Sequence, residues 1–305
     1  MAGVIVIGGA NVDIKGRSQA APIPATSNPG DVMTSLGGVG RNIAHTLALL
    51  AIDTAFIGFV GDDANGENLR RETAAAGVDI SMLGTCPEPT GTYLAILDDR
   101  GELVTAINDM RATEQLTPDH LMRHRSRLAA ARMIVADCNI SVSCLAWLFD
   151  FALPHSVKLV IEPISVPKSR KLLDLPSWHG GFLVTPNAMQ LEALTGSRDA
   201  MAGIAVLHRK GFRNAVVHRG REGAIASDGL APPQVIAIAP AGQVSDVTGA
   251  GDAAVAGLVC GLILGHDIVA SARLGQAAAA LKIGSGSSIA AGINRDSILA
   301  IAGLK

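Results

Sequence analysis

Residues 245–254 of this 305-residue chain read SDVTGAGDAA, a Gly-Ala-Gly turn followed at once by a carboxylate and then by small apolar residues. A helix that begins near Thr248 or Gly249 leaves the backbone N–H groups of its first turn without intrahelical acceptors, and its dipole adds about half a positive charge there. Glycine lets a ligand approach this backbone without a Cβ in the way. The turn formed by Gly249, Ala250 and Gly251 therefore predicts an anion site suited to phosphate oxygens.

The carboxylate of Asp252 has two interpretations at this position. As a structural residue, an aspartate in a first helical turn interacts favourably with the helix dipole. As a chemical group, it would stand beside a phosphoryl group held by the N–H groups and accept a proton from an attacking hydroxyl. Phosphoryl transfer needs little beyond positioning, charge stabilisation and such a base, so we favour the second interpretation.

The same residues also fit the dinucleotide fingerprint G-x-G-x-x-A, since 249–254 read GAGDAA. That fingerprint belongs to a βαβ unit and is followed about 20 residues later by an acidic residue that binds a ribose. Here a pair of expected helices follows, after the strands of the sheet have already passed. The P-loop pattern G-x-x-x-x-G-K-[ST] does not occur in the sequence, which excludes a P-loop kinase.

A second group of polar residues lies in the first 50 residues. Residues 36–50 read LGGVGRNIAHTLALL, so that glycines including Gly38 precede a helix whose first turns contain Asn42. Nearer the N-terminus, Asn11 and Asp13 alternate with an apolar residue and share one face if the chain is extended. An amide and a carboxylate on one face can bind a vicinal diol. The alternative is an ordinary glycine-rich helix cap and the polar edge of a strand.

The rest of the chain alternates short apolar runs with helical patterns, which predicts strands and helices in turn. The expected strands are 4–7, 54–60, 133–137, 159–161, 182–185 and 215–218, and the expected helices are 40–50, 66–76, 117–130, 143–153, 187–195, 199–210, 250–265, 267–282 and 294–302. This order predicts an α/β fold, a three-layer α/β/α sandwich with a mostly parallel central sheet. Two β-rich pieces, about 11–35 and 90–110, break the rhythm, and we expect them to form one small projecting sheet, a lid.

Composition excludes several classes of partner. The net charge is −2, from 25 basic and 27 acidic residues, and 3% of residues are aromatic, so no nucleic-acid partner is expected. The longest apolar stretch, 253–264, is too short to span a bilayer, and no basic segment precedes the first apolar run as in a signal peptide. The four cysteines lack C-x-x-C spacing and predict reduced core thiols. We therefore expect a cytoplasmic protein with no membrane partner.

The segments GGVGRN at 37–42 and DVTGAGD at 246–252 resemble the two signatures of the PfkB (ribokinase-like) family of carbohydrate and nucleoside kinases. Residues 58–80 are similar to the family's segment between them, so the resemblance covers nearly the whole chain. It implies a ribokinase-like fold in which a small β-sheet lid covers the kinase domain. The implied boundaries are 1–10, 36–89 and 111–305 for the α/β kinase domain, and 11–35 and 90–110 for the lid.

Within the family, shorter segments resemble the pseudouridine kinases. These segments are SNPG at 27–30, GGVGRNIA at 37–44, INDM at 107–110, VADCNIS at 135–141 and LAWLFD at 145–150. Enzymes of that branch phosphorylate the 5′-hydroxyl of pseudouridine with ATP. The resemblance therefore implies a small-molecule nucleoside substrate, ATP and Mg²⁺ as cofactors, K⁺ as in some relatives, and a homodimer formed through the lid.

The resemblance also implies roles for individual residues. The implied residues are Asp252 as catalytic base with Gly249, Ala250 and Gly251 as the anion hole; Asn11, Asp13, Gly38 and Asn42 for the ribose; Asn108 and Asn139 for the nucleobase; Asn187, Gly220 and Gly223 for the nucleotide; and Asp246 and Thr248 for a monovalent cation.

Two departures from the family pattern concern the nucleotide side. The family's N-x-x-E segment, whose Glu arranges Mg²⁺ through water, reads NAMQLE from Asn187 on, so that Gln190 stands at the Glu position. Gln190 and the nearby Glu192 are the candidate residues on the metal side. The strand before Gly220 usually ends in Thr or Ser, but here it ends in His218.

Three functions are consistent with these observations. We favour a nucleoside kinase; the second is a kinase of a sugar or another small alcohol on the same fold, and the third is a non-catalytic nucleoside-binding protein. ATP turnover separates the third function from the other two. The presence of Asp252 after a complete Gly-Ala-Gly turn argues against the third.

Overall fold

A computed structural model describes residues 3–240, 247–285, 289–290 and 292–304, and within them the main sheet has nine strands in the order β13-β12-β11-β10-β9-β8-β1-β4-β5. The strands are β1 (Val4–Ile7), β4 (Thr54–Gly61), β5 (Asp79–Cys86), β8 (Met133–Asp137), β9 (Lys158–Glu162), β10 (Gly181–Val184), β11 (Asn214–His218), β12 (Ala224–Ser227) and β13 (Gln234–Ile236). Neighbours from β11 to β5 pair in parallel, which confirms the predicted mostly parallel sheet.

Three strands of this sheet were not predicted. β12 and β13 extend one edge with antiparallel pairing, and β5 forms the other edge. β12 and β13 have only four and three residues, and β5 has only three buried residues, so each gives a weak pattern in the sequence. Edge strands of this kind are defined by pairing with a neighbour more than by their own pattern.

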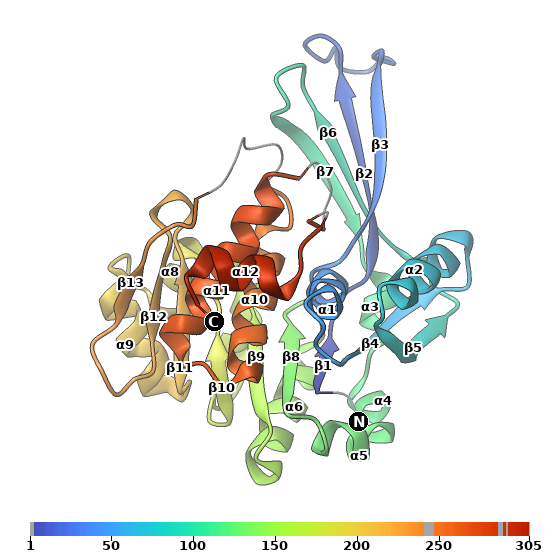
Figure 1. The fold of residues 1–305 in the computed structure, drawn as a ribbon. Coiled ribbons are helices and arrows are strands. Elements are labelled where there is room, and N and C mark those ends of the chain that lie inside the picture. The colour runs from blue at the N-terminus through green and yellow to red at the C-terminus, as the bar shows by residue number, and fades with distance from the viewer. Residues whose placement is uncertain (1–2, 241–246, 286–288, 291, 305) are drawn as a thin grey trace.

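Helices cover both faces of the main sheet (Figure 1). The helices are α1 (Val39–Leu49), α2 (Ala64–Ala75), α3 (Arg111–Glu114), α4 (Pro118–Arg123), α5 (Arg125–Ala129), α6 (Val142–His155), α7 (Val166–Ser169), α8 (Ala188–Thr195), α9 (Ala200–Lys210), α10 (Ala250–Leu264), α11 (Ile268–Ile283) and α12 (Arg295–Ala302), with 3-10 turns η1 (Arg170–Asp174) and η2 (Gly220–Glu222). Alternate residues of β1 enter two separate cores: Val4 and Val6 on one face, Ile5 and Ile7 on the other. This alternation is the period of two that a strand buried on both faces requires.

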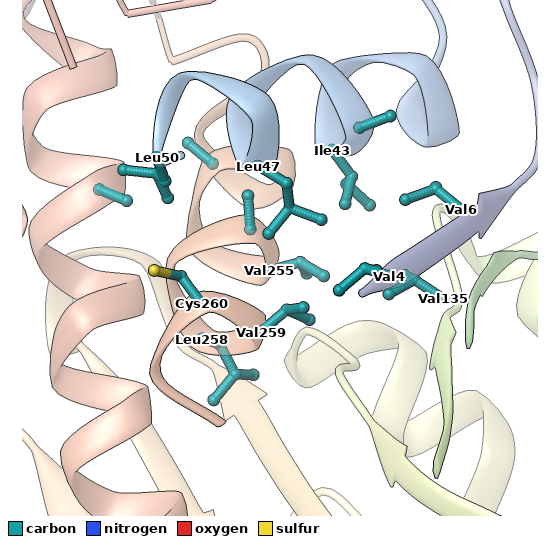
Figure 2. Packing of buried hydrophobic residues seen from close by; sticks show 14 of the residues in the cluster. Val4, Val6, Ile43, Leu47, Leu50, Val135, Val255, Leu258, Val259 and Cys260 are labelled. Carbon is teal, nitrogen blue, oxygen red and sulfur yellow. The ribbon is translucent and has the colours of Figure 1, made fainter. Parts of the chain in front are cut away.

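Helices α1 and α10, which carry the two predicted glycine motifs at their N-termini, pack against each other beside β1 (Figure 2). Ile43 and Leu47 of α1 meet Val255 and Val259 of α10, and all four are completely buried. Burial of a Val, Leu or Ile side chain stabilises the fold by about 1.5–3 kcal/mol. The core therefore fixes the relative position of two helix N-termini that are about 210 residues apart in sequence.

A separate four-stranded sheet in the order β3-β2-β6-β7 projects from the body, and we call it the lid (Figure 1). Its strands are β2 (Asn11–Ser18), β3 (Gly30–Gly37), β6 (Gly91–Leu97) and β7 (Leu103–Asp109). The register places Asp13, Tyr93 and Asn108 in one row across β2, β6 and β7, and the next row, Ile14, Leu94 and Ile107, faces the opposite side. The lid therefore has one polar and one apolar face at its base.

Two further predictions about composition can be compared with the structure. The four cysteines, Cys86, Cys138, Cys144 and Cys260, are all buried and free, as predicted for core thiols. Of the helices in the described ranges, none combines the length and the apolar character needed to cross a bilayer.

Candidate active site

A cleft lies at the carboxyl ends of β1 and β8, between the lid and the N-termini of α1 and α10. Its volume is about 360 Å³, within the range of small-molecule sites. It is lined by Asn11, Asp13, Gly38, Val39, Asn42, Tyr93, Asn108, Met110, Asn139, Ile164, Ser165, Lys168, Thr248, Gly249 and Asp252. The structure thus brings together the residues assigned to the ribose, the nucleobase and the catalytic base.

The first turn of α10 has the geometry of an anion site. Gly249 is the N-cap with φ of 80°, a left-handed conformation that favours glycine, and no side chain in the described part of the chain caps the helix. Gly251 lies inside the first turn, and a Cβ added there would meet no atom of the described residues within 4 Å. The packing of these residues therefore does not require glycine at position 251.

Asp252 follows this turn, and its carboxylate lies in the cleft. The side-chain amide of Asn42 donates a hydrogen bond to its Oδ2 atom at 2.8 Å. Burial raises the pKa of Asp252 to about 7, and the charges of Asp137 and Asp13 contribute to the rise, while the Asn42 hydrogen bond and Lys282 oppose it. A general base is most effective with a pKa near the working pH, so this environment suits proton abstraction near neutrality.

Arg41 sets the orientation of the Asn42 amide. It is 3% exposed, and its Nη1 atom donates to Asn42 Oδ1 at 3.2 Å and to the Leu36 carbonyl at 3.3 Å. Because an arginine can only donate, it fixes the carbonyl end of the Asn42 amide and turns the NH₂ end toward Asp252. Burial lowers the pKa of Arg41 to about 10, which leaves it charged. Sequence analysis did not identify this residue as part of the site.

Asp137, at the end of β8, joins three segments behind the cleft. Its carboxylate is completely buried and accepts hydrogen bonds from the backbone N–H groups of Gly9 at 3.0 Å, Gly40 at 2.8 Å and Asn139 at 2.9 Å. The Asn139 side-chain amide adds a fourth hydrogen bond at 3.1 Å. Burial raises the pKa of Asp137, although these donors oppose the rise. Asp137 therefore holds the loops after β1 and β8 and the start of α1 in fixed relative positions.

The lid supplies the residues predicted to bind the ribose. Asn11 donates from its side-chain amide to Asp13 Oδ1 at 2.6 Å, so the two side chains share one face of β2 as predicted. Burial raises the pKa of Asp13, and the Asn11 hydrogen bond and the charges of Lys15 and Arg41 oppose the rise. Asp13 Oδ1 is thus oriented by one amide, and Asp13 lines the cleft, where its carboxylate could accept hydrogen bonds from hydroxyl donors.

The opposite end of the cleft, predicted to hold the nucleobase, contains a cation that sequence analysis missed. Lys168 of α7 donates from Nζ to Asn139 Oδ1, and both residues line the cleft. Burial lowers the pKa of Lys168, while Asp137 opposes the change. The ammonium of Lys171 donates to three carbonyl oxygens of residues 138–140 at 2.9–3.2 Å and fixes the loop that carries Asn139. Both lysines follow β9 and reach the loop after β8, a contact with no local sequence signal.

A further carboxylate, that of Glu162, lies near Asp252. Glu162, at the end of β9, accepts hydrogen bonds from the Thr185 hydroxyl at 2.5 Å and from the Ile164 N–H at 3.0 Å. Burial raises the pKa of Glu162 to about 8, and the charges of Asp252 and Asp137 add to the rise. The site thus concentrates several carboxylates at one edge of the sheet.

The residues predicted for the nucleotide lie at the ends of β10 and β11. Asn187 caps α8 and forms an isolated bridge with His218. Gly220 and Gly223 have φ of 57° and 77° and form a tight turn at η2, which explains why glycine stands at both positions. Burial lowers the pKa of His218 to about 4, and its Nε2 atom is buried without a hydrogen-bond partner in the described residues. A buried neutral imidazole nitrogen without a partner fits a place where a ligand supplies the missing hydrogen bond.

Gln190 and Glu192, the candidates for the metal side, are both engaged elsewhere. The Gln190 carbonyl oxygen accepts the Asn187 N–H at 2.8 Å in a capping box. Glu192 forms an exposed ion pair with Arg198 at 2.8 Å. No cluster of three or more His, Cys, Asp or Glu that could hold a metal ion occurs within the described ranges. Of the two residues predicted for a monovalent cation, Asp246 lies outside the described residues, and Thr248 lines the cleft.

Known proteins resemble this chain over most of its length. The profile described as pfkB family carbohydrate kinase matches residues 1–294. The chain is 36% identical to the pseudouridine kinase of Escherichia coli strain K12 over 292 residues, which are 92% of this chain and 90% of that protein. It is also 36% identical over 292 residues to a protein of the same organism named uncharacterized sugar kinase YeiI, covering 93% of this chain and 78% of that one.

Solved structures show the same architecture. A carbohydrate kinase from Agrobacterium tumefaciens superimposes with a TM-score of 0.86 at 30% identity, covering 100% of this chain and 98% of that one. A ribokinase from Arabidopsis thaliana, solved with ribose and ATP, superimposes with a TM-score of 0.86 over all of both chains. Its 24% identity supports the fold alone. The predicted sandwich with a small β-sheet lid is thereby confirmed.

Proposed function

Because the chain belongs to the PfkB family of carbohydrate kinases, which are phosphotransferases with an alcohol acceptor, we propose that it transfers the γ-phosphoryl group of ATP to the 5′-hydroxyl of pseudouridine. The observation that carries the proposal is one cleft in which Asp252 and the α10 anion turn face the polar residues of the lid. The products are pseudouridine 5′-phosphate and ADP, as expected for nucleoside catabolism.

In the proposed reaction, Asp252 accepts the proton of the 5′-hydroxyl as its oxygen attacks the γ-phosphorus. The bond from that phosphorus to the bridging oxygen of ADP breaks, and the negative charge that develops lies against the N–H groups of Gly249, Ala250 and Gly251. Asn42 holds one oxygen of the Asp252 carboxylate, which leaves the other oxygen to receive the proton. Asn11 and Asp13 of the lid would fix the ribose so that its 5′-hydroxyl reaches the base.

The nucleobase would lie between Asn108 of the lid and Asn139 of the body, both of which line the cleft. Pseudouridine carries a ring N–H that uridine lacks, because its base is attached through carbon. An amide oxygen that accepts this N–H would be left without a partner by uridine, which makes selectivity of about 10⁴ attainable. Since Lys168 and Asp137 already engage the Asn139 amide, Asn108 is the stronger candidate for this acceptor.

ATP would occupy the surface near Asn187, Gly220 and Gly223, where the orphaned His218 nitrogen fits a ligand atom. Mg²⁺ would enter the site as part of the Mg²⁺–ATP substrate. Gln190 and Glu192 do not fit a direct ligand role in this structure, since both side chains have other partners. We propose that ATP phosphates and water supply most of the metal's ligands. We also propose that Asp246 and Thr248 bind K⁺, as the family resemblance implies.

A sugar kinase is the second candidate, because YeiI is as similar to this chain as the pseudouridine kinase is. The anion turn, Asp252, Asn11 and Asp13 would serve a sugar equally well, so the candidates differ only at the nucleobase end of the cleft. There Asn108 and Asn139 offer hydrogen bonds that a free pentose or hexose would leave unused.

The test is ADP release measured with pseudouridine, uridine, other nucleosides, ribose and fructose as acceptors. We expect the highest kcat/KM with pseudouridine and a product phosphorylated at the 5′ position. Equal efficiency with uridine would refute pseudouridine as the preferred substrate, and a preference for ribose or fructose would establish the second candidate. Failure to release ADP with every acceptor would indicate a binding protein that kept the fold.

The apolar face of the lid (residues 11–35 and 90–110) supports the proposed homodimer. Its exposed apolar residues are Val32, Leu94, Ile96 and Ile107. Leu94 and Ile107 are directly paired on the face opposite Asp13, so a second lid could cover them without closing the cleft. Light scattering should give twice the monomer mass for the native chain and the monomer mass for Ile107→Lys.

A further inference from the structure

We propose that Lys168 of α7 recognises the nucleobase of the acceptor, by donating a hydrogen bond from its ammonium to a carbonyl oxygen of the base. This inference rests on the proposed kinase function and narrows the class of acceptor to nucleosides whose base carries a carbonyl group. Neither the family resemblance nor the similar proteins assign a role to this lysine. Lys168 lines the cleft together with Asn139, and its Nζ atom donates to Asn139 Oδ1.

The segment that carries Lys168 has an unusual backbone conformation. Ile164 has φ of 66°, in the left-handed region that β-branched residues rarely adopt, and its N–H donates to Glu162 Oε1 at 3.0 Å. The Ser165 hydroxyl accepts the Lys168 N–H at 3.4 Å and caps α7. Ile164, Ser165 and Lys168 all line the cleft. Backbone outliers that neighbouring groups hold in place are typical of functional sites, and this one brings the start of α7 to the wall of the cleft.

Asn139, which the family resemblance assigns to the base, is already engaged at both ends of its amide. Its Nδ2 atom donates to Asp137 Oδ2 at 3.1 Å, and its Oδ1 atom accepts from Lys168. An ammonium carries three N–H groups and no acceptor. Asn139 Oδ1 is the one hydrogen-bond acceptor of Lys168 in the described part of the chain, so two N–H groups remain for a ligand or water. This wall of the cleft therefore offers hydrogen-bond donors to a base.

Lys171, three residues farther on, shows what a purely structural lysine does in this region. Its ammonium donates to the carbonyl oxygens of Cys138, Asn139 and Ile140 at 2.9–3.2 Å, which matches three acceptors to its three N–H groups. The loop after β8 is thus fixed without a contribution from Lys168. Lys168 differs because it lines the cleft and uses one N–H group within the described residues. Support of the loop alone therefore does not account for its position.

The chemistry of the base fits the donors of Lys168. Both ring nitrogens of the pseudouridine base carry a hydrogen, so its two carbonyl oxygens are the atoms that can accept from an ammonium. Lys168 is half-buried and has lost part of its hydration, which makes a charge-assisted hydrogen bond from a ligand more favourable than at an exposed position. Lys168 would act together with Asn108: the lysine donates to a carbonyl oxygen, and the lid amide accepts the ring N–H that distinguishes pseudouridine from uridine.

The experiment compares Lys168→Met with a matched control, Arg170→Met, which removes an exposed cation two residues farther on. The acceptors are pseudouridine and the C-riboside of benzene, which keeps the ribose, the carbon link and a flat ring but has no carbonyl group. We expect Lys168→Met to lower kcat/KM for pseudouridine by about 10 to 10², as for the loss of a hydrogen bond to a charged group. The loss should lie mainly in KM, because the contact is equally strong before and during phosphoryl transfer.

The benzene riboside separates recognition of the base from support of the fold. Its kcat/KM should change by less than about twofold in Lys168→Met, because it has no atom that accepts from the ammonium. A lysine that only supports the loop would lower both acceptors by the same factor, and that result would overturn the proposal. Arg170→Met should stay within about twofold of the native chain with both acceptors. If Lys168→Met does not fold, Lys168→Gln replaces it in the same comparison.

Calorimetric binding of pseudouridine without ATP gives a readout that does not depend on turnover. Lys168→Met should bind pseudouridine at least about tenfold more weakly than the native chain. Native affinity in this variant would overturn the role of Lys168 and leave the kinase function intact. If the native chain phosphorylates no acceptor, the kinase function fails, and the affinity for pseudouridine still decides the role of Lys168. A native chain that does not bind pseudouridine would refute it.

Discussion

Replacement of Asp252 by Asn should make the protein more stable while it removes the base. The folded-state pKa of Asp252 is raised to about 7, against about 3.9 in an unfolded chain. A carboxyl group with a raised folded-state pKa stabilises the fold while it is protonated, and that contribution is lost as pH rises toward 7. At about 1.36 kcal/mol per pH unit, the unfolding free energy of the native chain falls by about 2 kcal/mol by pH 5.5 and by at most about 4 kcal/mol by pH 8.5.

Asp252→Asn avoids this loss, since an amide does not ionise and its oxygen can still accept the Asn42 hydrogen bond. The variant's advantage in unfolding free energy should therefore grow by about 2 kcal/mol between pH 5.5 and 8.5. Removal of the Asp252 charge also relieves Glu162, whose pKa that charge raises, so the second effect has the same sign. Urea unfolding at several pH values measures the gain directly, and ADP release should meanwhile fall by about 10²–10⁴.

The matched control is Asp53→Asn, which removes one carboxylate from an exposed position and should show no comparable growth in stability with pH. A constant difference between native and Asp252→Asn chains across this pH range would show that Asp252 is ionised at low pH, and our account of its environment would be wrong. A less stable variant at pH 8.5 would refute it as well, because the carboxylate would then be a stabilising group.

Three further predictions concern the anion turn, the nucleobase and the metal. Gly251→Ala should raise the free energy of unfolding by about 0.5–1 kcal/mol, because a Cβ there meets no atom of the described residues within 4 Å. It should also abolish most activity, because the methyl group fills the space in front of the N–H groups of the first turn. Thermal unfolding measures the first effect and ADP release the second. Asn108→Ala should reduce the kcat/KM preference for pseudouridine over uridine, while an unchanged ratio would assign recognition elsewhere. Gln190→Glu should lower the Mg²⁺ concentration for half-maximal rate, whereas Glu192→Gln should do little; the reverse order would make Glu192 the metal-side carboxylate.

Local patterns were enough to predict the main elements of the site. The Gly-Ala-Gly turn predicted the start of α10, and alternation along β2 predicted that Asn11 and Asp13 share a face. The Asp137 network and the hydrogen bond from Lys15 of the lid to Thr248 were not predicted, because they join residues 97 to 233 positions apart. Sequence periodicity describes the shape of each element, whereas such contacts depend on how the elements pack together.

The glycines in the two motifs show most clearly that contacts between packed elements cannot be predicted from sequence periodicity. In the first motif, a Cβ at Gly37 would lie 2.4 Å from the Asp13 carboxylate. A Cβ at Gly40 would lie 3.1 Å from Asp137 Oδ2 and 2.9 Å from the backbone of Gly8. These glycines therefore make room for the protein's own buried carboxylates, whose charges in turn help to raise the pKa of Asp252.

Gly251 is the contrasting case, because the space in front of it is open. A glycine that packing does not require, in the first turn of a helix, weakens that helix by up to about 1 kcal/mol relative to alanine. Gly37 and Gly40 in the first motif and Gly251 in the second are thus glycines for different physical reasons, although both motifs look alike in sequence. Alanine substitution separates them: Gly40→Ala should destabilise the fold by displacing Asp137, whereas Gly251→Ala should stabilise the fold slightly and impair the ligand site.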